Sequence, residues 1–143
     1  MSEMTVYDYD DIQVIPLGPP GIVPPVASFN TVSLLTQSLS TSGAILTIDR
    51  ALGEWVTLQL TNDVTSIVVN NWPPPGNLGR VHLDIFNQGS YQILGWPPGS
   101  AAPYAGLPQL TPNGNDLIIM TSVDGGATTK IHIVGLNYMP LEG

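Results

Sequence analysis

The sequence predicts an all-β protein: an antiparallel β-sandwich of about eight strands, jelly-roll-like, preceded by an extended, proline-rich N-terminal arm. Three observations support this class. Apolar and polar residues alternate with a period of two over several short segments. Turn residues separate these segments. The 143 residues include 14 Pro and 15 Gly, which are too many for long helices. The pattern places the arm at residues 1–30 and the sandwich at residues 31–143.

The first thirty residues differ from the rest of the chain in charge and in proline content. Four acidic residues and no basic residue occur in the first eleven positions, and five Pro follow between residues 15 and 25. Proline removes backbone donors and favours extended geometry. We therefore expect an arm that is either disordered in the isolated chain or ordered on a partner. The residues of this arm predicted to dock on a partner are Tyr7, Tyr9, Ile12, Ile15, Pro19, Pro20, Ile22 and Val23.

Strands follow from about residue 31 onward. The clearest predicted strands, where alternation is strict, are 54–61, 79–87 and 128–137. Weaker candidates are 32–37, 44–49, 64–70, 91–95 and 116–122. The DGG sequence that precedes the last clear strand predicts a hairpin. Because no helical pattern separates the strands, we expect antiparallel pairing and no parallel sheet. The side chains predicted to face the core from the clearest strands are Val56, Leu58, Leu60, Val81, Leu83, Ile85, Ile131 and Ile133.

Composition excludes several classes of partner. Three basic residues against eleven acidic ones give a net charge of -8, so we expect no nucleic acid and no anionic membrane as a partner. No apolar run reaches 18 residues, and no signal peptide is evident. There is no Cys, hence no disulfide framework and no thiolate metal site. Only 10% of residues are charged, which favours a surface partly covered by partners.

Residue patterns for catalysis are lacking in the sequence. His82 and His132 occupy outward positions of two predicted strands, and without Cys they supply at most half of a zinc site. The alternative is that both imidazoles hydrogen-bond across the sheet. Carboxylates occur singly on different strands or turns, and no local signature selects a nucleophile. We therefore expect no enzyme activity, no cofactor and no metal site.

Aromatic residues carry the most information about surfaces. Trp55 faces outward and, next to Phe86 and Val134, is predicted to form an apolar patch that serves as a subunit interface. Trp72 and Trp96 each begin a Trp-Pro step and, with Tyr104, are candidates for contact with a glycan or another surface. The alternative is that the two Trp close the ends of the sandwich. The irregular segment 96–108 is expected to cover one end or to join a subunit contact.

Residues 42–138 follow an order of elements that resembles the small β-sandwich domains of tailed-bacteriophage structural proteins. These elements are the strand LTID at 46–49, a turn at Gly53, the strand EWVTLQL, the segment TNDVTSI, the turn PPPG at 73–76, the step Trp96-Pro97, the DGG hairpin and the closing GLNY at 135–138. The resemblance implies a virion surface protein, commonly trimeric, with no enzyme activity and no cofactor.

The leading hypothesis from this resemblance is a homotrimeric capsid decoration or cement protein. Its arm would hold it on the major capsid protein or another virion protein, on the particle surface, after synthesis in the host cytoplasm. The chain lacks the long shaft of a full fibre, which disfavours the alternative of a tail-fibre, head-fibre or baseplate component that binds the host surface. A second alternative, from a different class, is a carbohydrate-binding module that recognises a host surface glycan.

Overall fold

A computed structural model describes residues 34–103 and 106–141 of the chain. The predicted arm at residues 1–30 and its docking residues lie outside the described residues, as does Tyr104. The described part contains eight strands and one 3-10 helix, and none of it is α-helical. The elements are β1 (Thr36–Ser40), β2 (Ile45–Asp49), η1 (Arg50–Leu52), β3 (Trp55–Leu60), β4 (Ser66–Asn70), β5 (Gly79–Asn87), β6 (Ser100–Ala101), β7 (Asn115–Ser122) and β8 (Thr129–Gly135).

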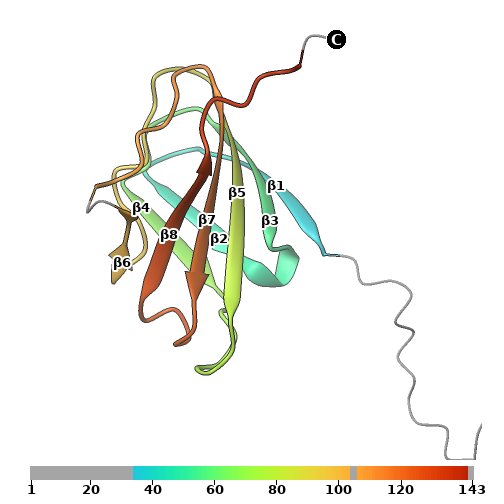
Figure 1. Cartoon of the computed structure of the whole chain (residues 1–143), viewed down its shortest axis with the longest axis vertical. Coiled ribbons are helices and arrows are strands. Elements are labelled where there is room, and N and C mark those ends of the chain that lie inside the picture. Colours follow the sequence, from blue (N-terminus) through green and yellow to red (C-terminus); the bar gives the residue numbers. More distant parts are fainter. Residues whose placement is uncertain (1–33, 104–105, 142–143) are drawn as a thin grey trace, which may run out of the picture. The chain divides into compact units, whose positions relative to one another are not determined.

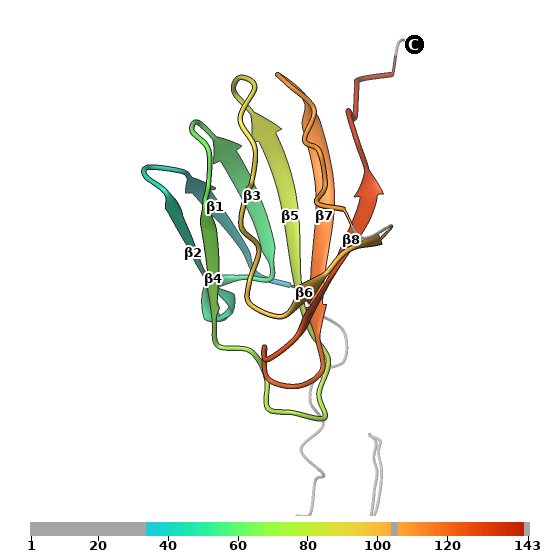
Figure 2. The ribbon, with the colours of Figure 1, turned by 90° about the vertical axis from the view of Figure 1, so that its left-hand side faces the viewer.

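The strands form two sheets (Figures 1 and 2). The larger sheet has six strands in the order β1-β3-β5-β7-β8-β6, and the smaller one pairs β2 with β4. Apolar side chains from both sheets pack into one buried cluster, which places the core between the sheets. The all-β class predicted from the alternation is therefore confirmed for the described residues.

The prediction of antiparallel pairing throughout is wrong, because the larger sheet is mixed. β1, β3 and β5 pair in parallel, whereas β5, β7 and β8 pair antiparallel. β2 and β4 also pair in parallel, as do β6 and β8. Two parallel strands of one sheet need a connection that crosses over between them, and the prediction allowed only a helix in that connection. In this protein a strand of the opposite sheet lies in it instead. From β1 to β5 the chain alternates between the two sheets, so every second strand returns in the same direction.

Most predicted strands occur close to their predicted positions. The three clearest predictions correspond to β3, β5 and β8, and the DGG turn joins β7 to β8 in the predicted antiparallel hairpin. The strand predicted at 32–37 is shifted toward the C-terminus, to β1. The segment 91–95 is not a regular strand, although Ile93 forms a single parallel bridge with Val64. The two-residue strand β6 was not predicted.

The predicted core is confirmed except at one position. The inward residues of β3 and β5 are fully buried, and Ile131 of β8 is 2% exposed. Ile133, predicted to face inward, is instead 38% exposed. The reason is that β6 pairs with β8 only at Thr129 and Lys130, so the later part of β8 has no neighbouring strand on that side. Each fully buried Leu or Ile contributes on the order of 1.5–3 kcal/mol relative to an exposed one.

Candidate functional site

Alternate side chains of the six-stranded sheet point away from the core and form a surface that we call the outer face. Its members are half-buried on the central strands, in contrast to the buried positions between them. They include Trp55, Thr57, Gln59, His82, Asp84, Phe86, Leu117, Ile119, Thr121 and His132.

One row of the outer face crosses four strands. The strand registers pair Trp55 with His82, His82 with Ile119, and Ile119 with His132. The rings of Trp55 and His82 stack with their centroids 5.3 Å apart and their planes 19° from parallel. Side chains in register on one face of a sheet are nearest neighbours. The row is therefore a continuous surface of aromatic, imidazole and aliphatic groups.

His82 occupies an unusual position for an imidazole. Its Nδ1 is buried and has no hydrogen-bond partner among the described residues. Burial lowers the pKa of His82 below its usual value, and the positive charge of Arg80 lowers it further, while Glu54 acts in the opposite direction. The net effect favours the neutral ring, which is the form that stacks on Trp55 with the smaller desolvation cost.

The two His are not brought together. β7 lies between their strands, and Ile119 separates the two rings within the row. His132 instead shares a hydrogen bond of 2.9 Å between its Nε2 and the hydroxyl of Thr121. Among residues 34–103 and 106–141, no group of three or more His, Asp or Glu side chains is placed to hold a metal ion.

The apolar patch predicted from Trp55, Phe86 and Val134 is only partly assembled. Phe86 pairs with Gln59, four residues along the strand from the position of Trp55, so the prediction that Trp55 lies next to Phe86 is wrong. That offset is about 13 Å at the usual rise of a strand. Leu117 and Ile119 lie on the strand beside Phe86 and extend the apolar surface, although sequence reasoning had not selected them. Val134 is 49% exposed and lies at an irregularity where Leu117 pairs with Gly135.

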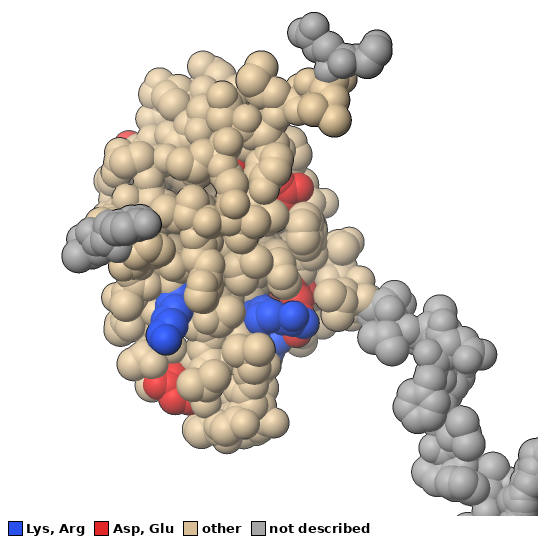
Figure 3. Space-filling view, viewed as in Figure 1, with Lys and Arg blue, Asp and Glu red and all other residues tan. Residues whose placement is uncertain are grey.

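Basic side chains gather at one end of the molecule. Arg80, Thr121 and Lys130 form the terminal row of the outer face in register. Arg50 lies close by, because its Nε donates to the carbonyl oxygen of Arg80 over 3.0 Å. These are all the Lys and Arg residues of the chain. In Figure 3 they occupy the lower part of the view, and most of the surface above them is uncharged.

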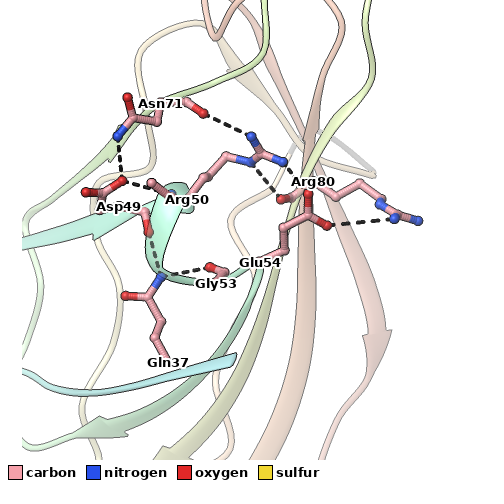
Figure 4. A network of polar contacts seen from close by, with 8 residues as sticks. Gln37, Asp49, Arg50, Gly53, Glu54, Asn71 and Arg80 are labelled. Carbon is pink, nitrogen blue, oxygen red and sulfur yellow. Dashed lines mark hydrogen bonds and ion pairs between the residues drawn. The ribbon is translucent and has the colours of Figure 1, made fainter. Parts of the chain in front are cut away.

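A polar network closes the same end of the molecule (Figure 4). The guanidinium of Arg50 donates to the carbonyl of Asn71 over 2.9 Å and pairs with Glu54 over 2.5 Å. The Oε1 of Glu54 also lies 3.7 Å from the Nη2 of Arg80. The guanidinium carbon of Arg50 is 5.5 Å from the ring centroid of Trp72, a cation–π geometry. The ion pairs of Glu54 with Arg50 and Arg80 join η1 and the start of β3 to β5, while the Oε1 of Glu54 is buried without a hydrogen-bond partner among the described residues.

Backbone groups complete this network. The Nε2 of Gln37 donates to the carbonyls of Asp49 and Gly53, each over 2.8 Å, and thereby ties β1 to the turn at η1. Asp49 accepts hydrogen bonds from the side chain of Asn71 and from the backbone of Ala51, and these lower the pKa of its carboxyl group. No pattern in the sequence indicated this network, because the i,i+4 spacing of Arg50 and Glu54 predicts an ion pair only on a helix.

Trp72 and Trp96 lie against the hydrophobic core cluster. Both rings are partly buried and pack on the core cluster, and the Nε1 of Trp96 is buried without a partner among the described residues. A Cβ added at Gly79 would meet Trp72, as would one at Gly126, so the ring fits closely over both glycines. This packing agrees with the alternative that the two Trp close the sandwich. Their contact with a glycan remains a prediction.

The turn between β7 and β8 is held by one carboxylate. Asp124 accepts hydrogen bonds from the backbone and hydroxyl of Thr128, over 2.9 and 2.5 Å, and from the hydroxyl of Ser122 over 2.8 Å. The bonds from Thr128, followed by the bond from Ser122, lower the pKa of Asp124 to about 2. The turn also contains Gly125 and Gly126 with φ of 74° and 91°, a conformation that favours glycine.

Comparisons of the chain with protein-family models, with curated proteins and with solved structures find no match. Within the described residues, no helix is both long enough and apolar enough to cross a membrane.

Proposed function

We propose that this chain is a structural protein of a bacteriophage virion, a homotrimeric decoration protein that residues 1–30 attach to the capsid. In this proposal the body is a β-sandwich, and its outer face forms the contact between copies. The single observation that carries it is the row of Trp55, His82, Ile119 and His132. Monomeric proteins seldom leave a contiguous aromatic and aliphatic surface open to water.

The distribution of charge supports the same assignment. Charged residues make up 10% of the chain, and the basic ones lie at one end of the outer face rather than across it. Interface centres are depleted in charge because each charge must be desolvated when the surfaces meet. The described residues also contain no metal-binding cluster. A binding role therefore has more support on this surface than a catalytic one.

The arm supplies the second part of the proposal. Three identical arms on one trimer act together, because binding of the first raises the effective concentration of the other two. Individually weak attachments can then hold the trimer for a long time. The arm's combination of Pro, Tyr and aliphatic residues suits an extended segment that lies on a partner's surface.

Imaging of virions tests the proposed function directly. Electron cryomicroscopy would compare particles produced with the gene for this chain and particles produced without it. We expect threefold-symmetric density on the capsid surface that disappears in the deletion. Density lost from the tail instead would favour the alternative of a tail-fibre or baseplate component, and identical particles would contradict a virion role.

A truncation tests the role of the arm separately. A chain without residues 1–30 should still form a trimer, because the proposed contact between copies lies on the body. It should no longer co-sediment with particles that lack the full-length protein. Normal co-sedimentation of the truncated protein would show that the arm is not the attachment.

A further inference from the structure

A shallow groove lies at the end of the molecule opposite the basic side chains. It has a volume of about 420 Å³ and runs between the C-terminal end of β5, the turn before β7 and the segment that follows β8. In Figure 1 these three parts meet in the upper part of the view. Neither of the two basic residues of the outer face lines the groove, and no carboxylate lines it either. The groove is therefore neutral.

Amide and aromatic side chains dominate its lining. Amides come from Asn113 in the turn before β7, from Asn115 at the start of β7 and from Asn137 after β8. Phe86 and Tyr138 contribute rings. Phe86 is half-buried, whereas Tyr138 is 49% exposed, with its ring close to Gly135. The groove thus combines neutral hydrogen-bonding groups with apolar ring surfaces.

Backbone hydrogen bonds fix the walls of the groove. The fully buried Asp116 accepts from the backbone amide of Asn137 over 2.7 Å and from that of Thr111 over 2.7 Å. The backbone amide of Tyr138 donates to the carbonyl of Asn115 over 2.7 Å. One buried carboxylate therefore holds both the turn before β7 and the segment after β8, so the groove is preorganised.

The three asparagine side chains that line the groove differ in the hydrogen bonds that they make within the protein. The Nδ2 of Asn115 donates to Asp84 over 2.8 Å and to the carbonyl of Ile85 over 3.1 Å, which orients the group and leaves its oxygen as an acceptor. Asn113 and Asn137 are exposed, and their backbones adopt left-handed conformations with φ of 52° and 57°. The oxygen of Asn137 lies close to Gly114, so this side chain reaches back over the turn.

We propose that this groove binds a neutral saccharide. An amide offers donors and an acceptor side by side and can pair with two adjacent hydroxyl groups, while an exposed ring can cover the C–H face of a sugar. The volume falls within the usual range for small-molecule sites, about 300–1,000 Å³. The lining itself contains no Lys, Arg, Asp or Glu side chain with which a charged ligand could form an ion pair. The inference does not depend on the proposed virion role.

Glycan binding by the full-length protein tests this proposal. A glycan array that carries neutral and acidic oligosaccharides would identify a neutral oligosaccharide, and isothermal titration would then measure its affinity. We expect binding to at least one neutral glycan and a loss of tenfold or more in the double variant Asn137→Gly, Tyr138→Ala. Glycine is chosen at 137 because it tolerates the left-handed backbone.

A matched control separates the groove from a general loss of structure. Asn71 also has a left-handed backbone, with φ of 66°, and lies in the polar network at the other end. The variant Asn71→Gly should keep full affinity, and thermal unfolding should show that both variants are folded. The proposal would be overturned by binding to acidic glycans only, by no binding at millimolar concentration, or by unchanged affinity in the folded double variant. Loss of affinity in Trp96→Phe alone would also overturn it.

Discussion

The carboxylate of Asp124 organises the turn between β7 and β8. Three neighbouring groups depend on its negative charge, since the hydroxyls of Ser122 and Thr128 and the backbone amide of Thr128 all donate to it. An amide at this position would place a donor where an acceptor is needed. Turn sequence alone had indicated a hairpin at this point, but only the structure identified which side chain holds it.

The variant Asp124→Asn tests this turn. The pKa of Asp124 is about 2 in the folded protein and 3.8 ordinarily, so the carboxylate stabilises the fold above pH 3.8 and loses this effect as the pH falls toward 2. We expect the variant to unfold at a lower urea concentration than the wild type at pH 6. The difference should shrink as the pH approaches 2. An equal difference at both pH values would contradict this role for the charge.

His82, on the outer face, gives the stability of the protein a second dependence on pH, in addition to that of Asp124. Its folded pKa is lowered below 6.5, so the unfolded chain binds more protons in the interval below 6.5. Stability should therefore fall as the pH is lowered from 7 toward 5, at constant protein concentration. The variant His82→Gln should lose this part of the pH dependence, whereas His132→Gln should retain it. Thermal unfolding at several pH values checks this, and identical slopes in wild type and His82→Gln would contradict it.

Among the elements, the parallel strands show where sequence reasoning succeeds and where it fails. Alternation correctly predicted β3 and β5, because each buries one face in the core and exposes the other. It could not predict which strand pairs with which, since alternation reports only the two faces of a strand. The row of Trp55, His82, Ile119 and His132 on the outer face depends on that pairing. Trp55 was recognised as an outward residue, but its neighbours His82 and Ile119 required the register.

The candidate groove escaped prediction for a related reason. Its amides come from a turn and from a segment after the last strand, and they are joined through Asp116, a buried residue that no motif marks. Asn residues in turns are ordinarily explained by their tolerance of left-handed backbones. Only the placement of Asn113 beside Asn137 and Tyr138 suggested a further role.

A substitution of Gly95 tests the close approach of the segment 91–95 to β4. A Cβ on Gly95 would collide with the carbonyl oxygen of Thr65, which belongs to the rigid backbone. We expect Gly95→Ala to destabilise the protein by about 1–3 kcal/mol, the usual cost of overpacking. Gly89→Ala is the control, because neither glycine has a positive φ and a Cβ on Gly89 would meet the side chain of Tyr91, which can move, rather than rigid backbone. Chemical denaturation should show the larger loss for Gly95→Ala, and the reverse order would contradict the packing argument.

At the scale of the whole molecule, the two ends and the outer face have separate roles in this account. The basic residues and the polar network close one end, the neutral groove lies at the other, and the outer face between them is the proposed contact with further copies. This division can be tested by placing a charge on either sheet. Ile119 lies in the outer row, whereas Val68 lies on β4 of the smaller sheet and is 42% exposed.

Ile119→Arg should dissociate the proposed trimer, because it places an unpaired charge at the centre of the proposed contact. Val68→Arg makes the same chemical change outside that contact and should leave the trimer intact. Both variants should remain folded by circular dichroism, since neither side chain lies in the core. Dissociation by Val68→Arg alone would move the contact to the smaller sheet.

The most direct test of the account is the mass of the full-length protein in solution at micromolar concentration, measured by light scattering. Association through the outer face predicts about 46 kDa, three times the 15.2 kDa mass of one chain. A mass of 15.2 kDa would mean that the outer face does not join copies of this chain, and would contradict the account.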